Sequence, residues 1–185
     1  MFDDTNEVED FWSGNLTDVK EEKNLLPPTK DVKLLIREVD IYDSYDDGST
    51  RLWKQIRVNF ELREGIEVAG EIKYRGSRVS QMIPYFAEPN HYDYKKPFFA
   101  KAQFLVPLVQ LVKATQSESP KMIKGGLEDE AVVVLVDSLK GKTVLGTILQ
   151  VPVSVKNPDT GIYEATADLQ NEVKYFKQLP DSMSV

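Results

Sequence analysis

Residues 52–63, LWKQIRVNFELR, place aromatic and cationic side chains on one side of an expected β-strand. One parity is apolar and is interrupted only by Lys54; it holds Leu52, Ile56, Val58, Phe60 and Leu62. The other parity is polar; it holds Trp53, Gln55, Arg57, Asn59, Glu61 and Arg63. Successive strand side chains point to opposite faces, so the first set can build a core and the second can meet solvent or a ligand. The polar row suits unpaired nucleic acid, because Arg neutralises phosphates and rings stack on bases. It is also typical of the solvent face of an ordinary antiparallel sheet.

Further candidate cations and aromatic rings occur along the chain. Four of the candidates lie in an expected loop at 85–99, which is dense in aromatic and basic residues. The candidate nucleic-acid-binding residues are Trp53, Arg57, Tyr74, Arg75, Arg78, Tyr92, Tyr94, Lys95, Lys96, Lys142 and Lys174. Tyr74 shares the parity of Ile72, so its ring can belong to the core instead.

Residues suited to catalysis or metal binding are few. His91 is the only histidine and there is no cysteine, so a His-based triad, a thiol nucleophile and a Cys-based zinc site are not expected. The acidic segment 43–49 lacks the ligand spacing of a calcium loop. Glu71-Ile72-Lys73 matches the Glu-x-Lys piece of metal-dependent nucleases, with Asp46 or Asp47 as acidic partners, but strand alternation explains it equally well. We expect no catalytic residue, metal or cofactor, and keep a metal-dependent nuclease as a minor alternative.

The elements that would position these residues follow from periodicity and turn signals. Strands are expected at 32–42 and 52–62, joined by an Asp-Asp-Gly-Ser turn, and a third strand at 71–86, interrupted at Gly76 and Pro84. Apolar spacing of three and four predicts a helix at 104–115. Residues 128–138 fit a helix or a strand, and the acidic start with a later glycine favours helix. Strands at 143–155 and 163–177 follow. This order predicts a mainly β fold with one or two helices, a five-stranded OB-fold-like barrel with long loop insertions.

Charge is distributed unevenly over the 185 residues, whose net charge is −7. Residues 1–30 hold eight acids and three lysines, which leaves 22 acids and 20 bases in the rest of the chain. We therefore expect an acidic N-terminal arm at 1–27, one domain at 28–178 and a short tail at 179–185. No apolar run approaches the roughly 20 residues of a membrane span. The acidic N-terminus predicts no secretory signal, and the lack of cysteine fits a reducing compartment, so we expect a cytoplasmic protein.

Several short segments, in this order, resemble the single-stranded DNA-binding proteins of bacteriophage replication modules. They are Leu25-Leu26-Pro27-Pro28, the turn at 43–50 with the strand at 52–62, the helix at 104–114, LKGKTV at 139–144 and NEVKYF at 171–176. Together they cover about residues 25–178. The chain departs from that family in two ways. Its net charge is negative, and its acidic segment lies at the N-terminus, whereas many single-strand binders carry an acidic C-terminal tail; here the tail at 179–185 holds only Asp181.

The resemblance implies an OB-fold core that binds single strands without sequence preference and protects replication or recombination intermediates. It also implies homo-oligomers, and a location in the host cytoplasm if the protein is viral. The acidic arm, with Phe2, Phe11 and Trp12, is expected to recruit replication or recombination proteins or to compete for a basic groove. The alternative is a β-rich virion structural or protein-interaction module.

Overall fold

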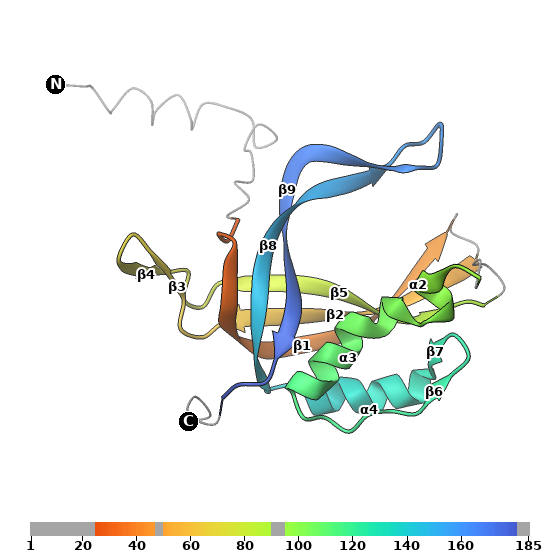
Figure 1. Ribbon diagram of the computed structural model, residues 1–185, viewed down its shortest axis with the longest axis horizontal. Coiled ribbons are helices and arrows are strands. Elements are labelled where there is room, and N and C mark those ends of the chain that lie inside the picture. Colours follow the sequence, from red (N-terminus) through yellow and green to blue (C-terminus); the bar gives the residue numbers. More distant parts are fainter. Residues whose placement is uncertain (1–24, 47–49, 90–94, 181–185) are drawn as a thin grey trace, which may run out of the picture.

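The computed structural model describes residues 25–46, 50–89 and 95–180. The fold is mainly β, as the sequence predicts. Its main sheet is antiparallel and seven-stranded, in the order β6-β7-β5-β2-β1-β8-β9 (Figure 1). The strands are β1 (Thr29–Asp46), β2 (Thr50–Leu62), β5 (Arg78–Ala87), β6 (Met122–Ile123), β7 (Gly126–Leu127), β8 (Thr143–Lys156) and β9 (Tyr163–Lys177).

The predicted parity of β2 is confirmed in its central part. Ile56, Val58, Phe60 and Leu62 are completely buried. The β1–β2 pairing runs from Leu34 opposite Leu62 to Asp46 opposite Thr50, which confirms the predicted hairpin. β2 then pairs with β5, and the three strands form a meander whose inner face carries the core.

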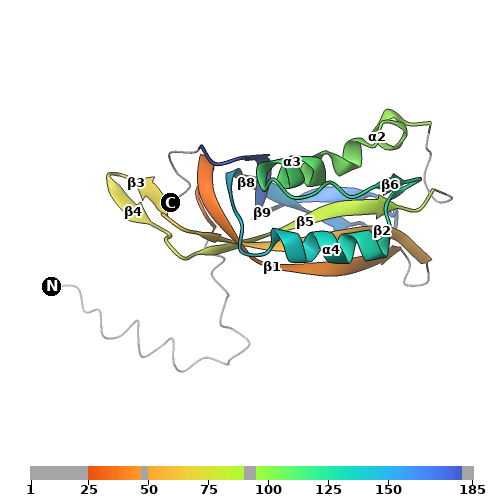
Figure 2. The ribbon, with the colours of Figure 1, turned by 90° about the horizontal axis from the view of Figure 1, so that it is seen from below.

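The inner face is covered by α3 (Val106–Ala114) and α4 (Asp129–Leu139). The short α2 (Pro97–Ala100) and the 3-10 turn η2 (Gln103–Leu105) precede α3. α3 packs against β5 and β9, and α4 packs against β1 (Figure 2). The predicted helix at 104–115 is confirmed: η2 forms its first turn and α3 the rest. Pro107 lies in the first turn of α3, where the backbone needs no N–H donor.

The ambiguous segment at 128–138 is a helix, because its apolar residues bury one helical face. Val132 and Leu135 are buried, whereas Val134, which lies between them, is 71% exposed. Asp129 and Glu130 lie in the first turn, where carboxylates interact favourably with the helix dipole.

The predicted strand at 71–86 is wrong as one element. The chain forms a separate hairpin, β3 (Ile66–Val68) with β4 (Glu71–Lys73), which projects from the body (Figure 1). A tight turn follows, in which the Ser77 N–H donates to the Tyr74 carbonyl at 3.0 Å, and only then does β5 begin. Gly76, with φ +79°, lies in this turn.

The prediction of a closed barrel is also wrong for the described strands, since β6 and β9 remain the edges of the main sheet. β9 nevertheless bends across the inner face and contacts β5. The Val173 N–H of β9 donates to Gln81 Oε1 of β5 at 2.8 Å. A side chain thus takes the hydrogen bond that a neighbouring strand would otherwise supply, and this leaves the sheet open at that position.

Lys54 breaks the apolar row of β2 because it connects the sheet to α4. Its Nζ lies 2.7 Å from Asp129 Oδ2 and 5.2 Å from the centre of the Phe86 ring. The Tyr85 hydroxyl donates to the same carboxylate at 3.2 Å. The charged group therefore has a partner at the end of the core, where an unpaired ammonium would be costly.

Candidate nucleic-acid interface

The outer face of β1, β2 and β5 carries a row of polar side chains along β2. Ser80 donates to Asn59 Oδ1 at 2.5 Å, and Asn59 donates to Glu38 at 3.5 Å. One step further along β2, Arg57 Nη2 lies 3.2 Å from Asp40 Oδ2, and both side chains are about half exposed. Arg57 is therefore on the predicted face, but it already has an acidic neighbour.

An arginine cluster around Glu61 occupies the end of this face. Arg37 makes a bidentate contact with the Glu61 carboxylate, with distances of 2.6 and 2.9 Å. The hydrogen bonds from Arg37 lower the pKa of Glu61 most; burial opposes them, and the charges of Arg37, Arg63 and Arg78 lower the pKa further. The hydrogen bonds to Glu61 and its negative charge raise the pKa of Arg37. Three arginines around one carboxylate leave a local excess of positive charge.

Arg75 extends this cluster, because its exposed side chain lies in the turn between β4 and β5. The Gly76 N–H donates to the Leu62 carbonyl at 2.8 Å, so this turn, with Arg75 and the nearby Arg78, lies at the end of β2. Exposed ion pairs contribute at most about 1 kcal/mol, so phosphates can exchange with the carboxylates here.

Trp53 keeps the predicted alternation, since the pairing of β2 with β1 is regular from Trp53 to Asn59, but its side chain is partly buried. The pairing of β2 with β5 shifts between Lys54 and Gln55 because β5 has an extra residue there, Tyr85, and Trp53 lies opposite the buried Ala87. The partly buried indole packs on Phe104 and Phe99, with ring centroids 5.5 and 6.4 Å away. Trp53 is therefore a support for neighbouring rings rather than an open platform.

Trp53, Phe98, Phe99 and Phe104 form an aromatic cluster. Its exposed ring is Phe98, which was not among the predicted binding residues. Its side chain is 46% exposed, while its centroid lies 5.1 Å from that of Phe99 and 6.1 Å from that of Phe104. Exposed Lys96 precedes it and exposed Lys101 follows it along α2. Lys95 is exposed beside them, whereas Tyr92 and Tyr94 lie outside the described residues.

A charge bias in the sequence marks this region. Residues 95–126 contain six lysines and only one acid, Glu118, so their net charge is +5 in a chain of −7. The sequence signal that could have identified Phe98 is thus its place near the start of a stretch, between Asp93 and Glu118, that contains no acidic residue.

The other three predicted residues are not brought to this surface. Tyr74 is partly buried against the core, which favours its structural reading. The ammonium of Lys142 donates to the Thr115 carbonyl at 3.0 Å and to Ser117 Oγ at 2.9 Å. Lys174 lies on β9, and its Nζ is 2.7 Å from Glu172 Oε2.

Within the described ranges, no group of three or more His, Asp or Glu side chains is arranged to hold a metal ion. Glu71 and Lys73, the residues of the nuclease-like piece, form an exposed ion pair of 3.2 Å with each other. None of the described helices combines the length and apolar character needed to cross a membrane.

Comparison with known protein families found no family that matches this chain, and no characterised protein matched its sequence. The resemblance to phage single-strand binders therefore stays a prediction.

Proposed function

We propose that this protein is a non-catalytic single-stranded DNA-binding protein that binds without sequence preference. The observation that supports it best is the exposed Phe98 ring between Lys96 and Lys101, within a segment of net charge +5. Stacking rings and phosphate-neutralising cations are the two contributions that single-strand binding needs. Arg57, Arg75 and Arg78 would extend the path along the outer face of the sheet.

The strand connectivity supports an OB-like arrangement. β1, β2 and β5 form a meander, α3 and α4 follow, and β8 returns to pair with β1 before β9 pairs with β8. OB folds have this element order, are often partly open and bind single strands on the outer face of their second and third strands. The biological setting proposed with it is the protection of replication or recombination intermediates, in a phage-encoded protein.

The interface has a defined length. Trp53, which packs on Phe99 beside the exposed Phe98, is eight positions from Glu61 on β2, so the two ends of the proposed path are about 27 Å apart along the strand at 3.3–3.4 Å per residue. Sites of about 4–16 nucleotides are usual for one OB fold. We therefore propose that one protein molecule contacts one short stretch of strand.

The test is titration of a fluorescent oligo-dT with the full chain at rising salt, followed by fluorescence anisotropy. The proposal predicts binding at low salt that weakens steeply as salt is added, with weaker binding to a duplex of equal length. Absence of binding at low salt would reject it.

A second candidate function is protein assembly, and the ribbon formed by the distal parts of β8 and β9 favours it. This ribbon extends away from the body (Figure 1). Tyr163 is 68% exposed, Val155 is 55% exposed, and β9 is an edge strand. Residues 151–170 hold one lysine and three acids, so the ribbon is better suited to a protein than to phosphates. A stable oligomer that is insensitive to salt and has no affinity for oligonucleotides would favour this function over DNA binding.

A further inference from the structure

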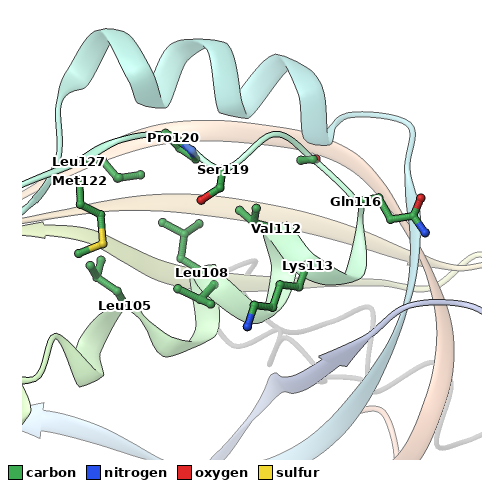
Figure 3. A pocket seen from close by; sticks show the side chains of 11 residues that line it. Leu105, Leu108, Val112, Lys113, Gln116, Ser119, Pro120, Met122 and Leu127 are labelled. Atoms are coloured by element: carbon green, nitrogen blue, oxygen red, sulfur yellow. The ribbon is translucent and has the colours of Figure 1, made fainter.

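An apolar groove lies between α3 and the segment that leads from it to β7. Leu108 and Val112 of α3 form one side, and Pro120 and Met122 form the other (Figure 3). Its volume is about 200 Å³. An apolar cavity of about 150 Å³ admits a benzene molecule, so the groove can hold an aromatic side chain.

The groove has exposed apolar residues at its mouth and cations around it. Val109, which lines it, is 43% exposed, and Met122 is 52% exposed. Lys113 lies at the rim (Figure 3). The lining segment belongs to the lysine-rich stretch at 95–126, in which Lys121 and Lys124 are also exposed. Such a groove suits a partner that combines an aromatic ring with carboxylates.

The chain itself contains a segment of this chemistry. Residues 1–24 hold eight acids and two lysines, and five of the acids precede Phe11 and Trp12. Their net charge of −6 complements the +5 of residues 95–126. Hydrophobic contact with a ring and attraction between opposite charges would therefore act together at this groove.

The length of the chain allows the contact within one molecule. The arm leaves the domain at Leu26, whose backbone N–H donates to Asn171 Oδ1 of β9 at 2.8 Å, and α3 packs against the same strand. Trp12 is 14 positions before Leu26, so an extended chain reaches up to about 48 Å. A domain of this length has a radius of gyration of about 16 Å. A short tether also raises the local concentration of the arm to the millimolar range.

We propose that the groove between α3 and β7 binds the Phe11-Trp12 segment of the molecule's own N-terminal arm, with the arm's carboxylates facing the lysines of residues 95–126. The contact shields these lysines from other anions. It does not depend on the proposed DNA-binding function, and it can be measured in the absence of DNA.

The test uses the fluorescence of Trp12 in the full chain, isolated as the difference between the wild type and Trp12→Phe. The chain has only two tryptophans, so Trp53 supplies the common background. We expect a blue-shifted Trp12 emission that is the same over a hundredfold range of protein concentration. Val109→Glu, at the mouth of the groove, should return it to the emission of a water-exposed indole. Val134→Glu is the matched control, because Val134 is an exposed helical valine on α4 that does not line the groove.

Lys113→Glu gives an independent check that leaves the apolar lining intact, and it should also reduce the blue shift. Circular dichroism verifies that each variant is folded. Water-exposed emission of Trp12 in the wild type would overturn the proposal, as would equal effects of Val109→Glu and Val134→Glu. A blue shift that grows with protein concentration would overturn the assignment to the molecule's own arm and indicate a second copy.

Discussion

Phe98 and its flanking lysines allow the two contributions to binding to be separated by substitution. Phe98→Ala removes a ring that is 46% exposed. The substitution should therefore reduce the affinity for a stacked base more than it reduces the stability of the domain. Stacking contributes about 1–3 kcal/mol per base, which corresponds to an affinity loss of about 5- to 140-fold. The loss should be the same at every salt concentration, because no charge is removed.

The double variant Lys96→Ala/Lys101→Ala should behave differently. Each phosphate contact on a single strand contributes about 0.7 to the slope of log affinity against log salt, so the slope should fall by about 1.4. Between 50 and 200 mM salt the variant should therefore lose about 7-fold less affinity than the wild type.

The assay is anisotropy of labelled oligo-dT at several salt concentrations. Tyr163→Ala is a matched control, because Tyr163 is also an exposed ring (68%) but lies on the β8–β9 ribbon. Equal losses for Phe98→Ala and Tyr163→Ala, or an unchanged slope in the lysine variant, would refute the assignment of this surface.

Three further predictions concern stability. Phe60→Ala should lower the free energy of unfolding by about 3–5 kcal/mol in urea denaturation, because the ring is completely buried and stacks on Phe176. Glu61→Gln should destabilise the protein above about pH 4.3, the ordinary Glu pKa, since Arg37 lowers the pKa of Glu61 in the folded state. The difference in unfolding free energy from wild type should shrink as the pH falls through that lowered pKa. A difference that stays constant down to acid pH would contradict the Arg37–Glu61 assignment. Gly126→Ala should lower the thermal midpoint, because a Cβ there would lie 2.1 Å from the Tyr85 carbonyl oxygen and φ is +141°; an unchanged midpoint would show that this approach of β7 to β5 is not a tight one.

Much of the fold could be predicted because burial in strands and helices repeats with fixed periods. The alternation of β2 identified the buried Ile56, Val58 and Phe60, and apolar spacing identified α3. The sequence at α4 fits a helix or a strand, because five apolar residues in succession match either period; the exposed Val134 distinguishes the two only in the structure.

What could not be predicted depends on contacts between distant segments. Trp53 stays on the polar face of β2, but Phe99 and Phe104 pack on it there, and no local pattern at Trp53 signals these contacts. The open edge at β9 depends on Gln81, whose side chain accepts a backbone hydrogen bond from a residue 92 positions away. The exposed ring of this cluster is therefore Phe98 and not Trp53, the ring that the sequence predicted to be open.

The proposed function is tested most directly by competition between unlabelled single-stranded and duplex DNA for the protein bound to labelled oligo-dT at low salt. Single strands of different sequence should displace the label at similar concentrations, and a duplex should require far more. Failure of the labelled strand to bind at all, or equal competition by the duplex, would contradict it.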